Sequence, residues 1–194
     1  MARHKDWPEV WDAIIAGQGI AGTTLAWRLR EAGLQVLLID ACETVTSSKI
    51  AAGLITPITG QRLVLTANCD ALLAEARGFY GSVERATGET FFHERTAVRL
   101  FTGEAERVAW GPRSLRPEYQ NYVVTPGPEP LVGAELAEAG EGGFVMAAAQ
   151  LDVAAYLAAS RAVLPWVSMV VDWTRDVVLG GDEIGRASCR EECA

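Results

Sequence analysis

The most informative stretch of this chain is DAIIAGQGIAGTTLAWRLREAGLQVLLID, residues 12–40. Residues 13–16 form a short apolar run, which indicates a buried strand, and residues 17–22 (GQGIAG) follow as a G-x-G-x-x-G turn. Small and apolar residues then recur at helical spacing over 23–31. Residues 35–39 form a second apolar strand that ends on Asp40. Strand, turn, helix, strand and acid in this order predict a dinucleotide-binding unit.

Each glycine of the turn has a physical role in such a unit. Gly17 lets the chain turn sharply out of the strand, Gly19 lets a pyrophosphate approach the backbone, and Gly22 lets the helix pack close to the strand. The N-terminus of the helix offers free N–H groups and the positive end of its dipole to the phosphates. Asp40 is placed to accept hydrogen bonds from ribose hydroxyls, which favours FAD or NAD over NADP. A glycine-rich turn in an ordinary α/β domain is the alternative interpretation.

Composition and charge limit the class of protein. Of the 194 residues, 49% are hydrophobic, which is enough for a buried core. The formal net charge of −8 argues against a nucleic-acid-binding surface. No apolar run approaches the length of a membrane span, and the first residues lack the apolar middle of a signal peptide. We therefore expect a cytoplasmic protein with no membrane partner.

The cysteines predict neither a metal site nor a disulfide framework. Cys42, Cys69, Cys189 and Cys193 form no C-x-x-C pair, and the two histidines are not grouped with them. We predict no metal ligand in this chain.

A second informative stretch is TVTSSKIAAGLITPITGQRL, residues 44–63. It opens with three hydroxyl residues in a row, Thr46, Ser47 and Ser48, which are residue types that cap helices and cover phosphates. The small residues 51–53 that follow let the backbone lie against a flat or bulky group. An ordinary loop remains open as an alternative, because composition alone does not exclude it.

Together, the two motifs resemble the D-amino-acid oxidase family of flavoproteins, of the glycine oxidase-like kind. The resemblance rests on G-x-G-x-x-G, a distant Asp, and then [ST]-S-x-x-A-A-G-L-[IL]-x-P. It implies FAD as the cofactor, with the hydroxyl loop over the pyrophosphate, residues 53–55 along the flavin ring, and an apolar side chain near the adenine. The predicted cofactor-binding residues are Gly17, Gly19, Ile20, Ala21, Gly22, Asp40, Ala41, Thr46, Ser47, Ser48, Gly53, Leu54, Ile55 and Val171.

The rest of the chain alternates between helical and strand-like patterns. We expect helices over 67–87 and 152–164, strands within 90–102, 122–125 and 142–151, and two short strands within 166–179. Residues 104–107 are expected to be a solvated face and 107–112 a short helix end. The predicted fold class is α/β, a Rossmann-like FAD-binding domain with an inserted, incomplete β-rich substrate domain.

The resemblance also implies a discontinuous arrangement of domains. Residues 1–11 are a lead-in, 12–66 and 151–181 the FAD-binding domain, and 67–150 the start of the substrate domain. Members of the family are generally about twice this length, and residues 182–194 are interpreted as a non-native tail. One back-translation of residues 183–187, GAG ATC GGA AGA GCG, resembles a common sequencing adapter. On this interpretation the chain is a truncated reading frame.

The activity implied by the resemblance is oxidation of a C–N bond in a small amino acid or amine, by hydride transfer to the flavin. The residues themselves show no catalytic acid, base or nucleophile, so the catalytic residues stay unknown and are expected in a missing second half. The fragment alone is then expected to be inactive. Two alternatives remain open: an NAD-dependent dehydrogenase and a non-catalytic dinucleotide-binding module. The sequence does not indicate the oligomeric state.

Overall fold

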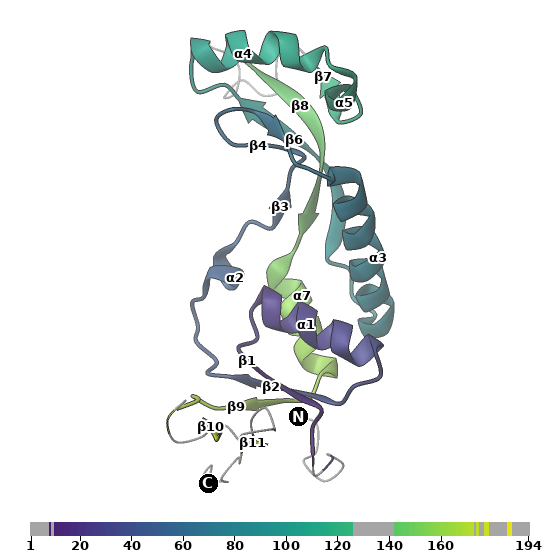
Figure 1. Cartoon of the computed structure of the whole chain (residues 1–194), viewed down its shortest axis with the longest axis vertical. Coiled ribbons are helices and arrows are strands. Elements are labelled where there is room, and N and C mark those ends of the chain that lie inside the picture. Colours follow the sequence, from purple (N-terminus) through teal and green to yellow (C-terminus); the bar gives the residue numbers. More distant parts are fainter. Residues whose placement is uncertain are drawn as a thin grey trace. The chain divides into compact units, whose positions relative to one another are not determined.

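The structure is a computed structural model of the chain, and it describes residues 8, 10–125, 142–172, 174, 177–178 and 186–187. The chain divides into a first unit, residues 1–51 with 153–194, and a second unit, residues 52–152 (Figure 1). In chain order the described elements are β1 (Ala13–Ala16), α1 (Ile20–Glu31), β2 (Val36–Asp40), α2 (Ser47–Ile50), β3 (Leu54–Ile55), β4 (Ile58–Thr59), β5 (Val64–Leu65), α3 (Cys69–Thr87), β6 (Phe92–Leu100), α4 (Glu104–Ser114), α5 (Pro117–Gln120), β7 (Val123–Thr125), β8 (Gly143–Leu151), α7 (Val153–Val163), β9 (Trp166–Ser168), β10 (Val177–Val178) and β11 (Arg186–Ala187).

The first unit contains a parallel sheet in the order β1-β2-β9. Its middle strand, β2, is the continuous apolar run VLLI followed by Asp40, and residues 36–39 are all buried. Such a run is typical of a parallel strand that is covered on both faces. Since β2 has a neighbour on each side, its last residue lies between the ends of two other strands. Asp40 therefore stands at the centre of the carboxyl edge of the sheet.

Helices α1 and α7 of the first unit are joined by hydrogen bonds between side chains. Trp27 Nε1 donates to Ser160 Oγ at 2.9 Å, with both residues buried, and the hydroxyls of Thr24 and Tyr156 are 3.1 Å apart. Because an unpaired buried donor is costly, these bonds fix the position of one helix on the other.

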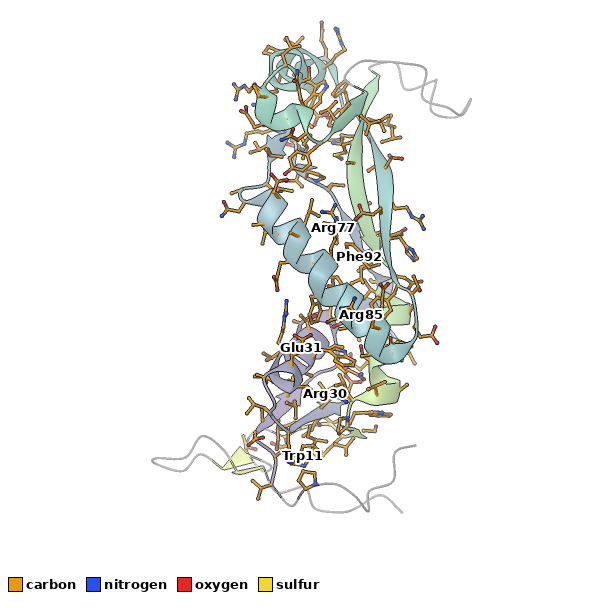
Figure 2. The ribbon with its side chains drawn as sticks, turned by 90° about the vertical axis from the view of Figure 1, so that its right-hand side faces the viewer. Trp11, Arg30, Glu31, Arg77, Arg85 and Phe92 are labelled. Carbon is orange, nitrogen blue, oxygen red and sulfur yellow. The ribbon has the colours of Figure 1, made fainter. Side chains whose placement is uncertain are left out.

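The second unit is organised around β8. This strand pairs antiparallel with β6 over nine residues each, and it also pairs with β3 and β7. Helix α3 packs beside β6: Phe92 stacks on Tyr80 with ring centroids 5.4 Å apart, and Arg77 Nε donates to Glu94 Oε1 at 2.6 Å (Figure 2). The turn between α3 and β6 is fixed by Glu84, whose Oε1 accepts the N–H groups of both Phe91 and Phe92 at 2.8 Å.

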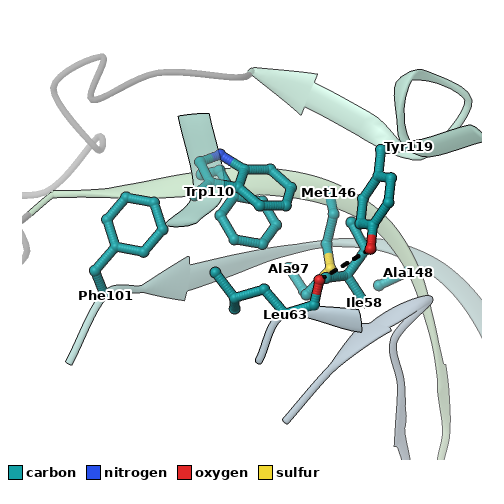
Figure 3. Close-up of a cluster of buried hydrophobic side chains, with 9 residues drawn as sticks. Ile58, Leu63, Ala97, Phe101, Trp110, Tyr119, Met146 and Ala148 are labelled. Carbon is teal, nitrogen blue, oxygen red and sulfur yellow. Dashed lines mark hydrogen bonds between the residues drawn. The ribbon is translucent and has the colours of Figure 1, made fainter. Parts of the chain in front are cut away.

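A cluster of aromatic and aliphatic side chains forms a core of the second unit (Figure 3). Trp110 of α4 stacks on Phe144 of β8 with ring centroids 3.8 Å apart. The buried hydroxyl of Tyr119 donates to the carbonyl of Leu63 at 3.2 Å and accepts from the N–H of Leu65 at 3.2 Å. This bond pair attaches the short β4–β5 hairpin to the core.

The α/β fold class is confirmed, and most elements match the expected ranges. The helix expected over 67–87 is α3, and Gly88 ends it in the left-handed conformation, with φ +77°. The helix expected over 152–164 is α7 and the strand expected over 142–151 is β8.

The expectation for residues 104–112 was right in part: Glu104 and Arg107 are exposed and residues 107–112 lie in the second half of a helix, but Glu106 is buried. Helix α4 begins at Glu104 and continues through Pro112, which removes one backbone bond in the last turn without ending the helix. Glu106 is buried rather than solvated: its Oε1 accepts from Arg99 at 2.8 Å and its Oε2 from the N–H of Thr102 at 2.8 Å. The ion pair satisfies the buried carboxylate, which a local charge pattern does not reveal.

Some expectations lie wholly or partly outside the described residues. Of the lead-in, only Pro8, Val10 and Trp11 are described, and of the 182–194 tail only Arg186–Ala187, which pairs as β11 with β10. Cys189 and Cys193 lie outside the described residues. The domain boundaries at 66/67 and 150/151, and the non-native tail, stay predictions.

Candidate functional site

The glycine turn connects β1 to α1 with very little space between them. Gly17 has φ +99°, a conformation that L side chains rarely adopt, and its N–H donates to the carbonyl of Ile39 at 2.7 Å. A Cβ at Gly22 would lie 2.0 Å from the carbonyl oxygen of Gly17 and 3.2 Å from Ile15 Cγ2. The approach of α1 to the turn is therefore one that only glycine permits at position 22.

The hydroxyl-rich loop meets this turn at the N-terminus of α1. Ser48 Oγ accepts the N–H of Ile20 at 3.0 Å, and a Cβ at Gly19 would come within 3.0 Å of the same oxygen. Thr46 starts the short helix α2 by accepting the N–H of Lys49 at 3.3 Å. Two motifs that are 28 positions apart in the sequence thus form one surface around a helix N-terminus, where backbone N–H groups and the helix dipole favour anions.

Asp40 lies beside the turn with its carboxylate held by three donors. Oδ2 accepts the N–H of Gln18 at 2.8 Å, and Oδ1 accepts the N–H of Cys42 and the Nη2 of Arg161, both at 2.9 Å. Partial burial raises the pKa of Asp40, but these hydrogen bonds and the positive charge of Arg161 lower it more, so the pKa lies below its ordinary value. Asp40 is therefore ionised at neutral pH and can accept a further hydrogen bond, since a carboxylate offers about four acceptor positions.

A cavity of about 460 Å³ lies over these groups in the first unit. This volume is within the usual range for a small-molecule site. The residues that line it come from the glycine turn, the end of β2, the hydroxyl loop and the segment after β9: Ala16, Gly17, Gln18, Gly19, Ile39, Asp40, Ala41, Glu43, Thr46, Ser47, Ser48, Lys49, Met169, Val170 and Val171.

The cavity brings together eight of the fourteen residues predicted from the sequence: Gly17, Gly19, Asp40, Ala41, Thr46, Ser47, Ser48 and Val171. Ile20, Ala21 and Gly22 form the first turn of α1 directly behind the glycine turn. The other three, residues 53–55, belong to the second unit. There the carbonyl of Gly53 accepts the N–H of Leu151 at 2.9 Å, and Leu54 and Ile55 form β3 against β8.

A second cavity in the first unit is similar in size, about 480 Å³, and lies at the opposite edge of the sheet. Trp11, Arg30, Val36 and Pro165 are among its residues, and it includes none of the predicted site residues. Ligands of open α/β sheets bind at the carboxyl ends of the strands, which favours the cavity at Asp40 as the functional one.

Sequence reasoning missed Arg161 of α7. Its Nη2 contacts Asp40, its Nε donates to Gln18 Oε1, its Nη1 lies 3.7 Å from Cys42 Sγ, and its guanidinium carbon lies 4.3 Å from the ring centroid of Trp166. The chain separates Arg161 from Asp40 by 121 positions. No local pattern could have paired the two residues.

No group of three or more His, Cys, Asp or Glu side chains in the described part of the chain is placed to hold a metal ion. Likewise, none of the helices described here has both the length and the apolar character needed to cross a membrane.

Comparison with known proteins assigns the family. Residues 12–164 match the model of the DAO family, described as FAD dependent oxidoreductase. The chain belongs to this family. Members bind FAD and are oxidoreductases, and the resemblance seen in the sequence is confirmed. No curated protein matches the chain.

Solved structures of amino-acid oxidases share the fold. Glycine oxidase from Bacillus cereus ATCC 14579 is 20% identical, with a TM-score of 0.59, over 90% of this chain and 51% of that one. Iminodiacetate oxidase from Chelativorans sp. BNC1 is 19% identical, with a TM-score of 0.53, over 93% and 53%. L-proline dehydrogenase from P. horikoshii is 16% identical, with a TM-score of 0.59, over 92% and 48%. The chain spans about half the length of these structures.

The residues around the cavity fit the dinucleotide part of FAD. Gly22 allows the close approach of α1, the ionised Asp40 carboxylate has acceptor capacity at the end of β2, and hydroxyls of the loop lie at a helix N-terminus. In addition, Gln18 Nε2 is buried without a hydrogen-bond partner among the described residues. A buried polar atom of this kind costs about 1–3 kcal/mol, which a bound polar ligand can offset.

Proposed function

We propose that this chain is the FAD-binding part of an oxidoreductase that oxidises a C–N bond of a small amino acid or amine. One observation carries the proposal: the glycine turn, Asp40 and the hydroxyl loop line a single cavity at the carboxyl edge of a parallel sheet. The family supports FAD as the ligand. The similar structures, which are a glycine oxidase, an iminodiacetate oxidase and an L-proline dehydrogenase, support the substrate class.

The chain's own residues would bind and orient the cofactor. The N–H groups at the start of α1, with Ser47 and Ser48, would bind the pyrophosphate oxygens, and Lys49 at the rim of the cavity would offset part of their charge. Asp40 would accept a hydrogen bond from a ribose hydroxyl, and Val171 would pack near the adenine. Bound FAD supplies a ring that accepts a hydride from the carbon next to the substrate nitrogen.

Residues 53–55 stay proposed contacts of that ring, by the family resemblance alone. No residue of this chain is proposed as catalytic. We propose that the chain binds FAD but does not oxidise substrate by itself, because it spans only about half of the neighbouring enzymes.

The test is to purify the chain and measure its flavin absorbance and its dissociation constants for FAD and NAD. Turnover is assayed with a panel of D- and L-amino acids and amines. We expect FAD binding and no turnover. NAD binding without FAD binding would favour a dehydrogenase, and turnover of any substrate would show that the catalytic residues lie within this chain.

Two matched variants make the binding test specific. Asp40→Asn should weaken FAD binding, because the amide keeps the size of the side chain but loses the charge that strengthens a hydrogen bond to ribose. Glu43→Gln removes an exposed acid from the rim of the same cavity and should leave the affinity unchanged or raise it. Equal losses in both variants would mean that any change at this cavity weakens binding, and would contradict a specific role of Asp40 in ribose recognition.

A further inference from the structure

We propose that Arg161 is a positioning residue for the nucleotide site, and that it acts by fixing the Asp40 carboxylate and the Gln18 side chain. The inference rests on the proposed function, because it assigns a role toward the same bound nucleotide. It adds a residue that the glycine and hydroxyl motifs do not contain.

The first argument is the number of groups that one guanidinium holds. The Arg161 side chain extends from α7 and contacts three residues in two segments of the site: Gln18 in the glycine turn, and Asp40 and Cys42 at the end of β2. It also lies over the ring of Trp166, 4.3 Å from its centroid, at the start of β9. The planar guanidinium has five N–H donors in fixed directions, so one ordered side chain sets several distances at once.

The second argument is where Arg161 contacts Asp40. It donates to Oδ1, which also accepts the N–H of Cys42, while Oδ2 accepts the N–H of Gln18 among the described residues. Fixing Oδ1 from the α7 side therefore holds the carboxylate in one rotamer and leaves acceptor capacity on Oδ2. The pair is only partly exposed, 29% for Arg161 and 18% for Asp40, so its attraction is less screened than that of a surface pair.

The third argument concerns Gln18, which is only 5% exposed. Because Arg161 can only donate, the amide oxygen of Gln18 must face it, and the amide NH₂ is turned to the other side. That NH₂ has no partner among the described residues. Arg161 thus determines the direction of a donor on Gln18 as well as of an acceptor on Asp40, and a ribose–pyrophosphate segment carries oxygens that match both.

The experiment measures ADP and FAD binding by calorimetry from pH 8 down into the acid range, for the wild type, Arg161→Met, Arg161→Lys and Asp40→Asn. Circular dichroism and thermal unfolding first identify the conditions in which each variant is folded. We expect Arg161→Met to bind ADP about tenfold more weakly at neutral pH, the loss typical of one charge-assisted hydrogen bond.

The pH profile separates positioning from a general structural role. Arg161 from α7 contacts the Asp40 carboxylate, and the charged residues Glu43 and Lys49 line the same cavity. ADP affinity should fall at low pH as Asp40 becomes protonated, and we call this fall the acid limb. Removing Arg161 should move the acid limb to higher pH, because the carboxylate protonates more easily without its cation. Arg161→Lys should restore the position of the acid limb and part of the affinity. Asp40→Asn should bind weakly with no acid limb from this group, and the adenine of ADP titrates alike in all variants.

Each outcome decides the matter. A folded Arg161→Met with wild-type affinity and an unmoved acid limb overturns the proposal. So does a weaker affinity with an unmoved limb and no rescue by lysine, since this result indicates only a structural role. If the wild type binds neither ADP nor FAD, the proposed function fails first and the role of Arg161 fails with it.

Discussion

Replacing Gly22 with alanine tests the close approach that the glycine turn requires. A Cβ at this position would lie 2.0 Å from the Gly17 carbonyl oxygen, whereas ordinary contact begins at 3.4 Å, so the turn or α1 must move by about 1.4 Å. The obstacle is backbone, which cannot rotate away as a side chain could. Overpacking of this kind destabilises a protein by about 1–3 kcal/mol or more. The higher helix propensity of alanine stabilises α1 by about 1 kcal/mol and offsets part of this loss. We expect a net loss of up to about 2 kcal/mol.

Gly78 provides the matched control, because it also lies inside a helix, α3, and a Cβ there would meet nothing within 4 Å. Gly78→Ala should stabilise the protein by about 0.5–1 kcal/mol through helix propensity alone. The assay is urea unfolding of both variants together with FAD affinity. Gly22→Ala should lose stability and most of its FAD binding, while Gly78→Ala should keep its affinity. If the two variants behave alike, the close-approach argument for the turn is wrong.

Three further predictions concern hydrogen bonds on either unit. Ser160→Ala should lower the free energy of unfolding by about 1–3 kcal/mol, because it leaves Trp27 Nε1 unpaired in the α1–α7 interface. Trp27→Phe should cost less in the Ser160→Ala variant than in the wild type, because the hydrogen bond is already lost there. A double-mutant cycle by urea unfolding measures the difference. Glu84→Ala should lower the free energy of unfolding by about 2 kcal/mol, because two backbone N–H groups at the start of β6 lose the carboxylate that accepts both. Thermal unfolding measures this loss, and the control Glu89→Ala, at an exposed acid, should change stability very little. Folding lowers the pKa of Asp40, so its contribution to stability is present above the ordinary pKa of 3.8 and is lost as the pH falls through the folded-state pKa. The unfolding free energy of the wild type should therefore approach that of Asp40→Asn in acid. A constant difference between the two proteins across pH would contradict the assignment.

What could be predicted from the sequence is what local spacing determines. The turn 17–22 and the acid at 40 belong to one continuous strand–helix–strand segment, so glycine conformation and hydrophobic periodicity were sufficient to predict them. The hydroxyl loop was also predicted, and the structure adds that Ser48 caps the N–H of Ile20.

The features that escaped prediction depend on contacts between different elements of the fold, whether the two residues are 121 positions apart or seven. The pairing of Arg161 with Asp40 and the burial of Glu106 against Arg99 both depend on tertiary packing. A lone arginine in a helix, or a short run of charges, is by itself typical of a solvated surface. Only the fold shows that these particular charges are partly or fully covered and paired.

The interruption of the first unit by the second has a consequence for how the chain is completed on the ribosome. Strands β1 and β2 emerge first, but β9, the other neighbour of β2, follows only after residues 52–152 have been made. Strand β8, on which the sheet of the second unit depends, precedes β9 in the chain, with only α7 between them. The second unit can therefore complete its sheet before the first does. Until β9 arrives, the apolar strand β2 has an open edge, and this interval is when the nascent chain is most exposed to aggregation.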